Sequence, residues 1–471
     1  MGIDNVAIKT FNSTGSQSVC RASEADETKL IESQFLTKCT TKYINGSGIS
    51  FIPGKLSLLP IAGATSNETF TLPSDVDAIS EIIFHCEIKL AIADTESVKV
   101  SSSLVLDMIN KIEMKIGNLV FQTIRPCDIY ARNITEHGAA LKLLMSQSDA
   151  VVTNGTASNP ILTITEGGTT VTDNVTLDFS MSIPFTGRDS NTERSFLQAG
   201  ASTNSLSMKV YYNQFTAASG FSTTPASCIS GFFKPAGADN TASAAIVTGV
   251  STGICVLSHQ ITNTEKNFIQ KNIINRVVNT SQSVEHYFSG TDLTTGPSTL
   301  TIDLSNININ VSHIILSLAT TVYGTTQADV LVGEGATQGT SWTPREPFRP
   351  ARMAATDLGV QSGWLKSAEV LLGNDRTGNV PASCLSTNRI QQFNLKSADN
   401  KNLFIIKLAD CAFSTAGIPF ARLNNKKLIL KFADGFINAG NAAIDTATCV
   451  HVTCCGTQIQ TTVGGAISFS A

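Results

Sequence analysis

Short segments in which apolar and polar residues alternate recur along most of this chain. Residues 84–90 place Phe, Cys, Ile and Leu on one side and His, Glu and Lys on the other. Residues 112–116, 177–183 and 206–210 alternate in the same way. A period of two with one apolar side is typical of half-buried strands in antiparallel sheets. Connections rich in Gly, Ser, Thr and Asn separate these segments, so the pattern predicts an all-β protein.

Two other segments have the features of helices. Within an N-terminal arm at residues 1–45, Ser23 can cap a short helix over residues 24–38 that carries Asp26 in its first turn. This helix could pack on its own domain, or it could reach a neighbouring subunit or an internal membrane. A second helix is predicted from about residue 128 to residue 146, where it would cover an end or a side of the sheets.

The second half of the chain repeats the strand patterns of the first half in the same order. Residues 112–118, Ile-Glu-Met-Lys-Ile-Gly-Asn, are matched by residues 368–374, Ala-Glu-Val-Leu-Leu-Gly-Asn. Gly and Asn after a strand indicate that the same turn occurs twice. Pro184 and Pro419 should each end a strand or lie at an edge, because proline cannot donate to a ladder. Such a repeat predicts two copies of one β-fold. The other matched pairs are 71–84 with 301–316, 183–185 with 418–420, and 206–210 with 428–432.

The length of 471 residues suits two domains of about 200 residues each. Two similar β-domains with long loops and few short helices fit tandem jelly rolls, each an eight-stranded sandwich or barrel. Residues 215–255 are poor in charge and rich in small residues, which favours a long loop and a connection between domains. The predicted organisation is an arm at 1–45, a first jelly roll at 46–220, a linker at 221–254 and a second jelly roll at 255–471.

Charged residues make up 15% of the chain, against about 25% in a typical soluble domain. A surface poor in charge suits extensive protein–protein contacts, although any β-protein with Thr- and Asn-rich loops would have this composition. The formal net charge is −4, and the densest basic segments, 345–352 and 425–427, contain no run of five cations. We therefore expect no direct binding to nucleic acid.

The first twenty residues lack the apolar core of an export signal, and no apolar stretch has the length of a spanning helix. The eleven cysteines are scattered and form no C-x-x-C pair. We expect reduced, buried thiols in a protein that assembles in the cytoplasm.

The densest group of candidate metal ligands lies at residues 449–455. Cys449 and His451 share one side of a predicted strand, and Cys455 shares it too if the strand is regular. These side chains could contribute to a zinc site. Because no second ligand cluster has the usual spacing, buried thiols are the favoured interpretation. The sequence thus predicts no catalytic, cofactor-binding or metal-binding residue, and no cofactor.

Motifs for hydrolysis are also weak. Residues 249–253 match G-x-S-x-G, but a nucleophilic serine in this motif needs a helix directly after it, and residues 254–257 indicate a strand. The spacing of Asp189, Glu193 and Glu136 does not support a glycosidase acid pair. We therefore expect a protein that is not an enzyme.

Two polar or aromatic features could mark contacts. Arg188 and Asp189 could fix a loop through an ion pair or bridge to a neighbouring subunit, or they could be an ordinary exposed pair. Trp342 and Trp364 flank a Pro- and Arg-rich stretch at 344–352, which is typical of an ordered surface loop at an interface.

Two of these segments carry a resemblance to a known family. Residues 111–120 resemble the "I-E-x-x-I-G-G" strand of major capsid proteins from large eukaryotic double-stranded DNA viruses, and residues 181–189 are similar to their "L-P-F-x-x-x-R-D" segment. The chain departs from the family where a "P-F-F-F" run is common, since only Phe185 follows Pro184. Tailless bacterial and archaeal viruses with an internal membrane share the same double jelly-roll plan.

The resemblance implies a homotrimer in which each subunit contributes two upright jelly rolls to a pseudo-hexameric capsomer of an icosahedral shell. It implies a location in the virion, assembly in the host cytoplasm, and contacts with neighbouring capsomers and with minor, cement and penton proteins. The arm at 1–45 would then be a candidate for contact with an internal membrane. The alternative function is a carbohydrate-binding or adhesive β-sandwich surface protein, and a β-rich hydrolase is the third.

Overall fold

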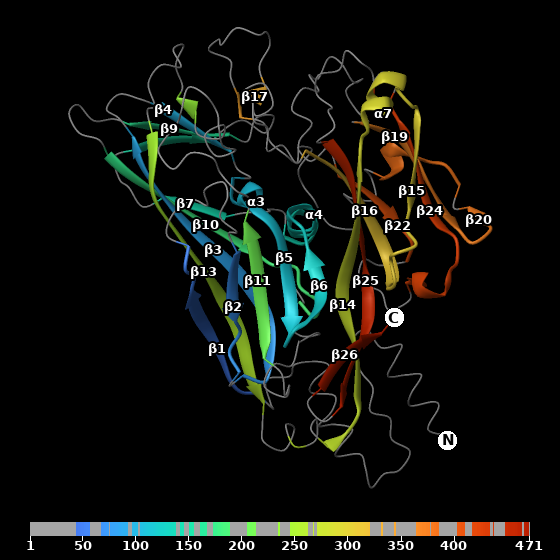
Figure 1. Cartoon of the computed structure of the whole chain (residues 1–471), viewed down its shortest axis with the longest axis horizontal. Helices are drawn as coiled ribbons and strands as arrows, with labels where there is room; N and C mark the ends of the chain where they lie inside the picture. Colours follow the sequence, from blue (N-terminus) through green and yellow to red (C-terminus); the bar gives the residue numbers. More distant parts are fainter. Residues whose placement is uncertain are drawn as a thin grey trace.

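The structure of this chain, a computed structural model, contains two β-sandwiches that stand side by side (Figure 1). The helix predicted in the arm lies outside the described residues, as do Asp189, Trp342 and residues 345–352. The structure describes residues 44–56, 67–74, 76–92, 97–101, 104–137, 142–145, 150–154, 161–166, 173–188, 205–212, 234–235, 245–261, 267, 271–320, 331–332, 343–344, 364–376, 378–385, 403–409, 417–433, 437, 448–463 and 466–470.

The first sandwich consists of two antiparallel sheets that enclose one core. One sheet has the strand order β1-β13-β3-β10-β7, and the other has the order β2-β11-β5-β6. The strands are β1 (Ile44–Pro53), β2 (Asn67–Thr71), β3 (Ala78–Ile92), β5 (Ile109–Ile116), β6 (Leu119–Ile124), β7 (Lys142–Met145), β10 (Asp173–Ser182), β11 (Leu206–Tyr212) and β13 (Ala245–Ile261).

The second sandwich repeats this arrangement. One sheet has the order β14-β25-β16-β22, with β23 on β16 and β26 on β25, and the other has the order β15-β24-β19-β20, with β21 on β19. The strands are β14 (Ile274–Tyr287), β15 (Thr299–Asp303), β16 (Asn310–Thr320), β19 (Leu365–Leu372), β20 (Asp375–Arg376), β21 (Val380–Pro381), β22 (Phe404–Lys407), β23 (Ile418–Pro419), β24 (Lys426–Phe432), β25 (Thr448–Val463) and β26 (Ala466–Ser470).

Smaller elements lie around the two sandwiches. In Figure 1, β4, β9 and β17 lie at the end of the molecule opposite to β26. None of the described helices is long and apolar enough to cross a lipid bilayer. The smaller elements are β4 (Ser97–Ser101), β8 (Ala150–Asn154), β9 (Ile161–Glu166), β12 (Lys234–Pro235), β17 (Leu331–Val332), β18 (Thr343–Pro344), α3 (Leu104–Met108), α4 (Pro126–His137), α7 (Gly290–Thr295) and the 3₁₀ turn η2 (Phe420–Arg422).

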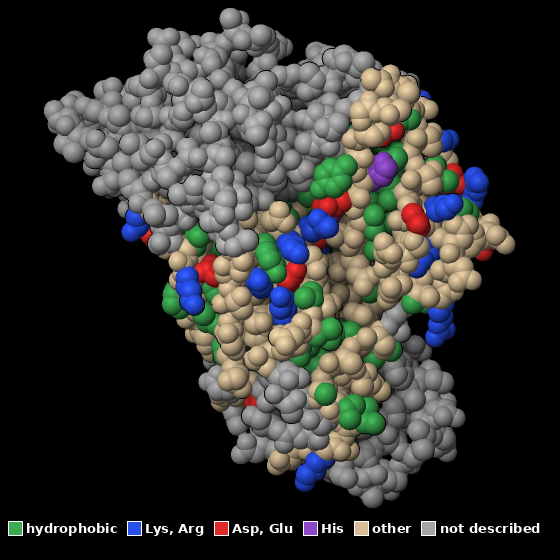
Figure 2. All heavy atoms as spheres, viewed as in Figure 1, with side chains coloured by type: hydrophobic (Ala, Val, Ile, Leu, Met, Phe, Trp, Pro, Cys, Tyr) green, Lys and Arg blue, Asp and Glu red, His purple; other side chains and the backbone are tan. Residues whose placement is uncertain are grey.

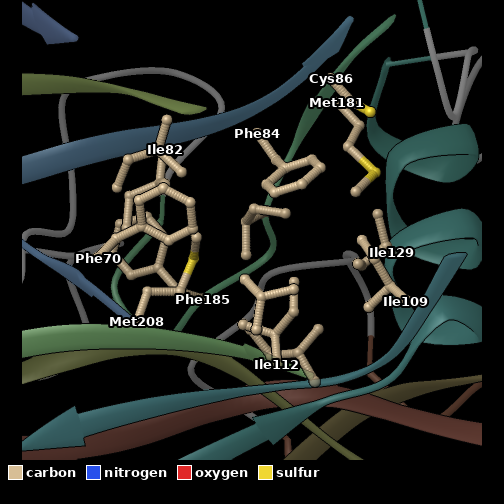
Figure 3. Close-up of a cluster of buried hydrophobic side chains, with 14 of the residues drawn as sticks. Phe70, Ile82, Phe84, Cys86, Ile109, Ile112, Ile129, Met181, Phe185 and Met208 are labelled. Carbon is tan, nitrogen blue, oxygen red and sulfur yellow. The ribbon is translucent and has the colours of Figure 1, made fainter. Parts of the chain in front are cut away.

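The apolar sides of the strands face each other and form the cores, as the alternation predicts. Figure 3 shows Ile82 and Phe84 of β3 opposite Met208 of β11 and Ile112 of β5. All four side chains are at most 1% exposed. Burying one such side chain contributes roughly 1.5–3 kcal/mol, so these buried strand faces are a large stabilising contribution to each sandwich.

The polar side of β5 carries a carboxylate with several partners. Glu113 lies 2.7 Å from Lys111 Nζ and 3.0 Å from Lys115 Nζ, and it accepts a hydrogen bond of 2.9 Å from the Tyr211 hydroxyl. Partial burial opposes ionisation, but these donors outweigh it and lower the pKa of Glu113 to about 2.

The internal repeat is confirmed by the strand pairing. The sheet order β2-β11-β5-β6 corresponds to β15-β24-β19-β20, and three of the four matched pairs of segments lie on corresponding strands, the exception being 183–185 with 418–420. Gly117 and Gly373 both have positive φ, 59° and 65°, so the same left-handed turn ends β5 and β19. Pro184 follows the end of β10, and Pro419 ends the short strand β23, as expected for proline.

The predicted helix at 128–146 is only partly correct. The helix α4 ends at His137, and residues 142–145 form the edge strand β7, in which Leu143 pairs with Phe179 of β10. The run of Leu, Lys and Met there has high helix propensity, but propensity is weak compared with a place at the edge of a sheet.

The predicted boundary between linker and second domain falls inside a strand. Residues 245–261 form β13, which pairs with β3 and with β1 in the first sandwich. The chain passes to the second sandwich between Ile261 and Ile274. One of the small residues that suggested a loop, Gly253, instead packs inside the sheet, where a Cβ atom would lie 2.5 Å from the ring of Phe51 on β1.

Candidate functional site: the contact between the two sandwiches

The helix α4 lies between the two sandwiches (Figure 1). Its start follows from local sequence: Pro126 occupies the first helical position, and the Asp128 carboxylate accepts a 3.0 Å hydrogen bond from the Arg125 backbone N–H. Ile129 packs into the first core. Ile134 packs into a separate small cluster with residues of the second sandwich. The helix therefore contacts both sandwiches. The other members of that cluster are Ala131, Ile315, Leu403 and Cys455.

A buried charge cluster lies on one side of α4. Glu136 accepts a hydrogen bond from Arg132 Nε at 2.8 Å and also pairs with the Arg188 guanidinium. The two arginines are only 1–2% exposed. Arg132 donates to the Pro184 carbonyl at 3.1 Å and to the Ser281 hydroxyl of β14 at 3.4 Å, so the cluster reaches the second sandwich.

Burial and ion pairing act in opposite directions on these arginines. Burial lowers the pKa of Arg188, and Glu136 offsets only part of that effect. Burial also acts on Arg132, but there Glu136 outweighs it and the pKa is raised. Both guanidinium groups carry their charge at any ordinary pH, so Glu136 is their essential counter-ion.

Neutral hydrogen bonds join the sandwiches beside this cluster. The Gln122 amide oxygen accepts from the Thr186 backbone N–H at 2.6 Å, and the Thr186 and Thr280 hydroxyls lie 2.8 Å apart. The Gly187 N–H donates to the Asn279 carbonyl at 2.9 Å. These buried donors and acceptors from β6, β14 and the turn after β10 find partners across the contact.

A second polar cluster lies at the N-terminal end of α4. His451 Nε2 is 2.9 Å from Asp128 Oδ1, and His451 Nδ1 is 3.4 Å from Glu285 Oε1. The other oxygen of Glu285 pairs with Arg125 at 2.7 Å. Asp128 also accepts hydrogen bonds from the Thr453 hydroxyl at 2.9 Å and the Ser283 hydroxyl at 3.0 Å.

The charges of this second cluster influence one another. Burial favours the neutral form of His451, but Asp128 and Glu285 outweigh it and raise its pKa to about 9. Burial likewise opposes ionisation of Asp128, and His451 outweighs it and lowers that pKa. Burial raises the pKa of the neighbouring Cys127 thiol well above its usual range.

The ion pairs that cross the contact are those of Asp128 with His451 and of Arg125 with Glu285, and Arg132 of the first cluster adds its bond to Ser281. Removing one partner from a buried ion pair leaves an uncompensated charge, which is strongly destabilising. Separating the sandwiches would break both of these crossing pairs. The arrangement is suited to holding two domains rigidly, and Glu136, engaged by two arginines, is not placed to act as a catalytic acid.

The expectation that Cys449, His451 and Cys455 share one side of a strand is confirmed. Cys449, His451 and Cys455 lie on the side of β25 that faces α4 and the first sandwich, and all three are buried. The ligand atoms that come together with His451 are those of Cys127 and Glu285, within 4.8 Å of one another.

Other predicted features have different surroundings. Arg188 is not part of an exposed pair, because it is buried against Glu136. Ser251 of the G-x-S-x-G match lies within the strand β13, not in a loop, and no helix follows it. Trp364 is a fully buried residue of the second core, packed against Phe404.

Sequence reasoning missed Arg132, Asp128 and Glu285. Arg132 and Glu136 are four residues apart on a predicted helix, which is a usable local signal. Nothing local distinguishes Glu285, because its partners Arg125 and His451 come from distant parts of the chain.

Neither the known protein-family models nor the curated proteins include a match to this sequence. Solved structures match over nearly the whole chain. PBCV-1 VP54, fitted into a reconstruction of the virophage Sputnik, has a TM-score of 0.60 at 11% identity and covers 93% of this chain and 99% of its own. A quasi-atomic model of the PBCV-1 capsid has a TM-score of 0.58 at 10% identity, with coverage of 93% and 99%.

The Faustovirus major capsid protein matches with a TM-score of 0.51 at 10% identity, and 97% of each chain is covered. Such a likeness at low identity concerns the fold, and it spans both sandwiches, in agreement with the repeated sheet order. This chain therefore has the double jelly-roll fold, the fold that it shares with the major capsid proteins of these viruses.

Proposed function

We propose that this chain is a major capsid protein, a structural subunit of the icosahedral shell of a double-stranded DNA virus, and not an enzyme. One observation carries the proposal: a single chain contains two copies of one jelly roll and resembles capsid subunits along 93% or more of its length. The resemblance covers nearly all of those chains too, so little of either is left over for another activity.

Two similar barrels in one chain explain how such a subunit would build a shell. Three identical chains related by a closed three-fold axis present six similar barrels. The result approximates six-fold symmetry and can tile a surface. This requires the two barrels to keep a fixed orientation, and the buried pair of Asp128 with His451 and the pair of Arg125 with Glu285 support that orientation.

The surface of the described residues fits a protein that contacts other proteins. Figure 2 shows Lys and Arg side chains lying beside Asp and Glu on the described part of this face, rather than forming a continuous basic surface. Together with the net charge of −4, this supports the expectation of no direct nucleic-acid binding.

The partners in this proposal are other copies of the chain in a homotrimer, neighbouring capsomers, and minor, cement and penton proteins. The arm at 1–45 is a candidate for contact with a neighbouring subunit or an internal membrane. The protein would reside in the virion after assembly in the host cytoplasm.

The first test is the mass of the purified protein by light scattering after gel filtration. A trimer has three times the chain mass of 49.9 kDa, about 150 kDa, and should resist dilution. Electron microscopy of that species should show a six-sided outline. A monomer that stays folded would contradict the proposal and would direct attention to an adhesive protein, which a glycan-binding screen would then examine.

A further inference from the structure

A compact set of metal-ligating side chains lies where α4 meets the second sandwich. The set consists of Cys127 from the first turn of α4, Glu285 from β14 and His451 from β25. Their ligand atoms all lie within 4.8 Å of one another. The side chain of His451 is fully buried and that of Glu285 is 9% exposed. Three separate elements thus direct sulfur, oxygen and nitrogen donors to one point.

The spacing of the closest two donors suits a tetrahedral metal. His451 Nδ1 and Glu285 Oε1 are 3.4 Å apart. Two ligands about 2.0–2.1 Å from a tetrahedral Zn²⁺ are roughly 3.3 Å from each other. The Cys127 sulfur lies within 4.8 Å of both of these atoms, and a bond of about 2.3 Å to the same Zn²⁺ would bring it to roughly 3.5 Å from each.

The geometry between the nitrogen and oxygen donors is a second observation at the same site. His451 Nδ1 is buried and makes no hydrogen bond of normal geometry, although Nε2 of the same ring has its partner in Asp128. Buried polar atoms nearly always have a partner. Because Nδ1 faces the Glu285 carboxylate, a positive charge, either a proton or a metal ion, is required between the two groups.

Neighbouring side chains orient two of the proposed ligands through hydrogen bonds and ion pairs, as residues around the ligands of zinc sites commonly do. Asp128 accepts from His451 Nε2, the arrangement that orients a histidine and leaves its other nitrogen for metal. Arg125 holds Oε2 of Glu285, which leaves Oε1 for the metal. Asp128 thus orients the histidine ring, and Glu285 is positioned to supply a ligand oxygen.

We propose that Cys127, Glu285 and His451 bind a structural Zn²⁺ that joins the two sandwiches, with Cys449 as the candidate fourth ligand. Cys449 lies two residues before His451 on the same side of β25 and is buried in the first core together with Cys127. Sulfur and imidazole donors with one carboxylate favour zinc over calcium or magnesium.

The proposed binding conserves charge. Zn²⁺ replaces the proton on His451 Nδ1 and the proton on the Cys127 thiol, so two protons leave as two positive charges enter. The cluster with Asp128 and Arg125 remains neutral in both states. If Cys449 also binds, a third proton leaves. The site is internal to one chain, so it does not depend on the proposed capsid function.

The test measures the metal content of the full-length chain. The protein is produced in medium with added zinc, exchanged into buffer with a chelator, and analysed by plasma mass spectrometry. A parallel preparation from cobalt medium is examined by absorption spectroscopy for a thiolate-to-cobalt charge-transfer band. The variants are C127A and E285Q, and the matched control is C86A, which removes a thiol equally buried in the same core.

We expect about one zinc per chain in the natural protein and in C86A, and at least a tenfold lower content in C127A, whose cobalt form should lack the thiolate band. If C127A does not fold, E285Q keeps the packing intact and should still show the loss. Zinc below about a tenth per chain in the natural protein, or equal retention in C127A and E285Q, would overturn the proposal. A trimer that lacks zinc would refute this site and leave the capsid function standing.

Discussion

Replacing Glu136 by Gln tests how much the buried charges on α4 stabilise the chain. The change preserves the size of the side chain and removes one negative charge from between Arg132 and Arg188, which are 1% and 2% exposed. Arg132 would keep its bonds to the Pro184 carbonyl and the Ser281 hydroxyl, and Arg188 would keep those to Asn133 and Ser182. What disappears is the counter-charge that both arginines share.

The expected cost follows from the two ion pairs that Glu136 makes. A hydrogen bond to a charged group contributes about 1.5–3 kcal/mol, and Glu136 makes one with each arginine. Gln can retain one of them through its amide oxygen, but the arginine charges then lack compensation. Breaking a buried ion pair by removing one partner costs about 3–5 kcal/mol, and we expect E136Q to destabilise the chain by that amount.

The assay is guanidinium unfolding followed by circular dichroism, at one protein concentration for all variants because assembly adds to apparent stability. The matched control is E369Q, because Glu369, itself 13% exposed, pairs at 3.3 Å with a single arginine, Arg376, whose side chain is 63% exposed. That variant should lose less than about 1 kcal/mol. An equally small loss in E136Q would refute the reasoning, because the buried cluster would then contribute no more than an exposed pair.

Further predictions concern the repeat, the pH dependence and the arm. Gly373→Ala should lower the free energy of unfolding by roughly 1 kcal/mol in a denaturant titration, because the backbone at this position has a φ of 65°, which alanine disfavours. No neighbouring atom obstructs a Cβ there, so the loss would come from the backbone alone. An unchanged midpoint would show that the turn is not constrained. Phe185→Ala and Phe420→Ala, at matched and fully buried positions, should each cost about 3–5 kcal/mol, and a large difference between them would argue against equivalent roles for the two copies. Glu113 has a folded pKa of about 2, below its unfolded value near 4.5, so its ion pairs stabilise the chain above about pH 4.5 and this contribution is lost as pH falls through about 2. In Glu113→Gln that part of the acid dependence should be absent, and an unaltered acid transition would exclude the assignment. Removal of the arm at 1–45 should leave trimers intact by light scattering and prevent shell formation, and normal shells from the shortened chain would contradict a contact role for the arm.

Much of the fold follows from short-range patterns in the sequence. Alternation in residues 84–90 and 206–210 identifies strands and the side that each one buries, because successive residues of a strand point to opposite sides of the sheet. The Gly-Asn turns after residues 116 and 372 identify two copies of one unit, since a left-handed turn residue is a local requirement. These features need only neighbouring residues, so one sequence is enough to predict them.

Tertiary structure alone decided how distant segments meet. The segment 142–145 became a strand because the edge of β10 was available to pair with it, and 245–261 joined the first sheet between β1 and β3. Likewise, His451 acquires Asp128 and Glu285 as partners from positions 323 and 166 residues away in the chain. Propensity and periodicity describe neighbouring residues only, so they cannot predict which distant residues will become partners. Those contacts form only once the folded chain brings the segments together.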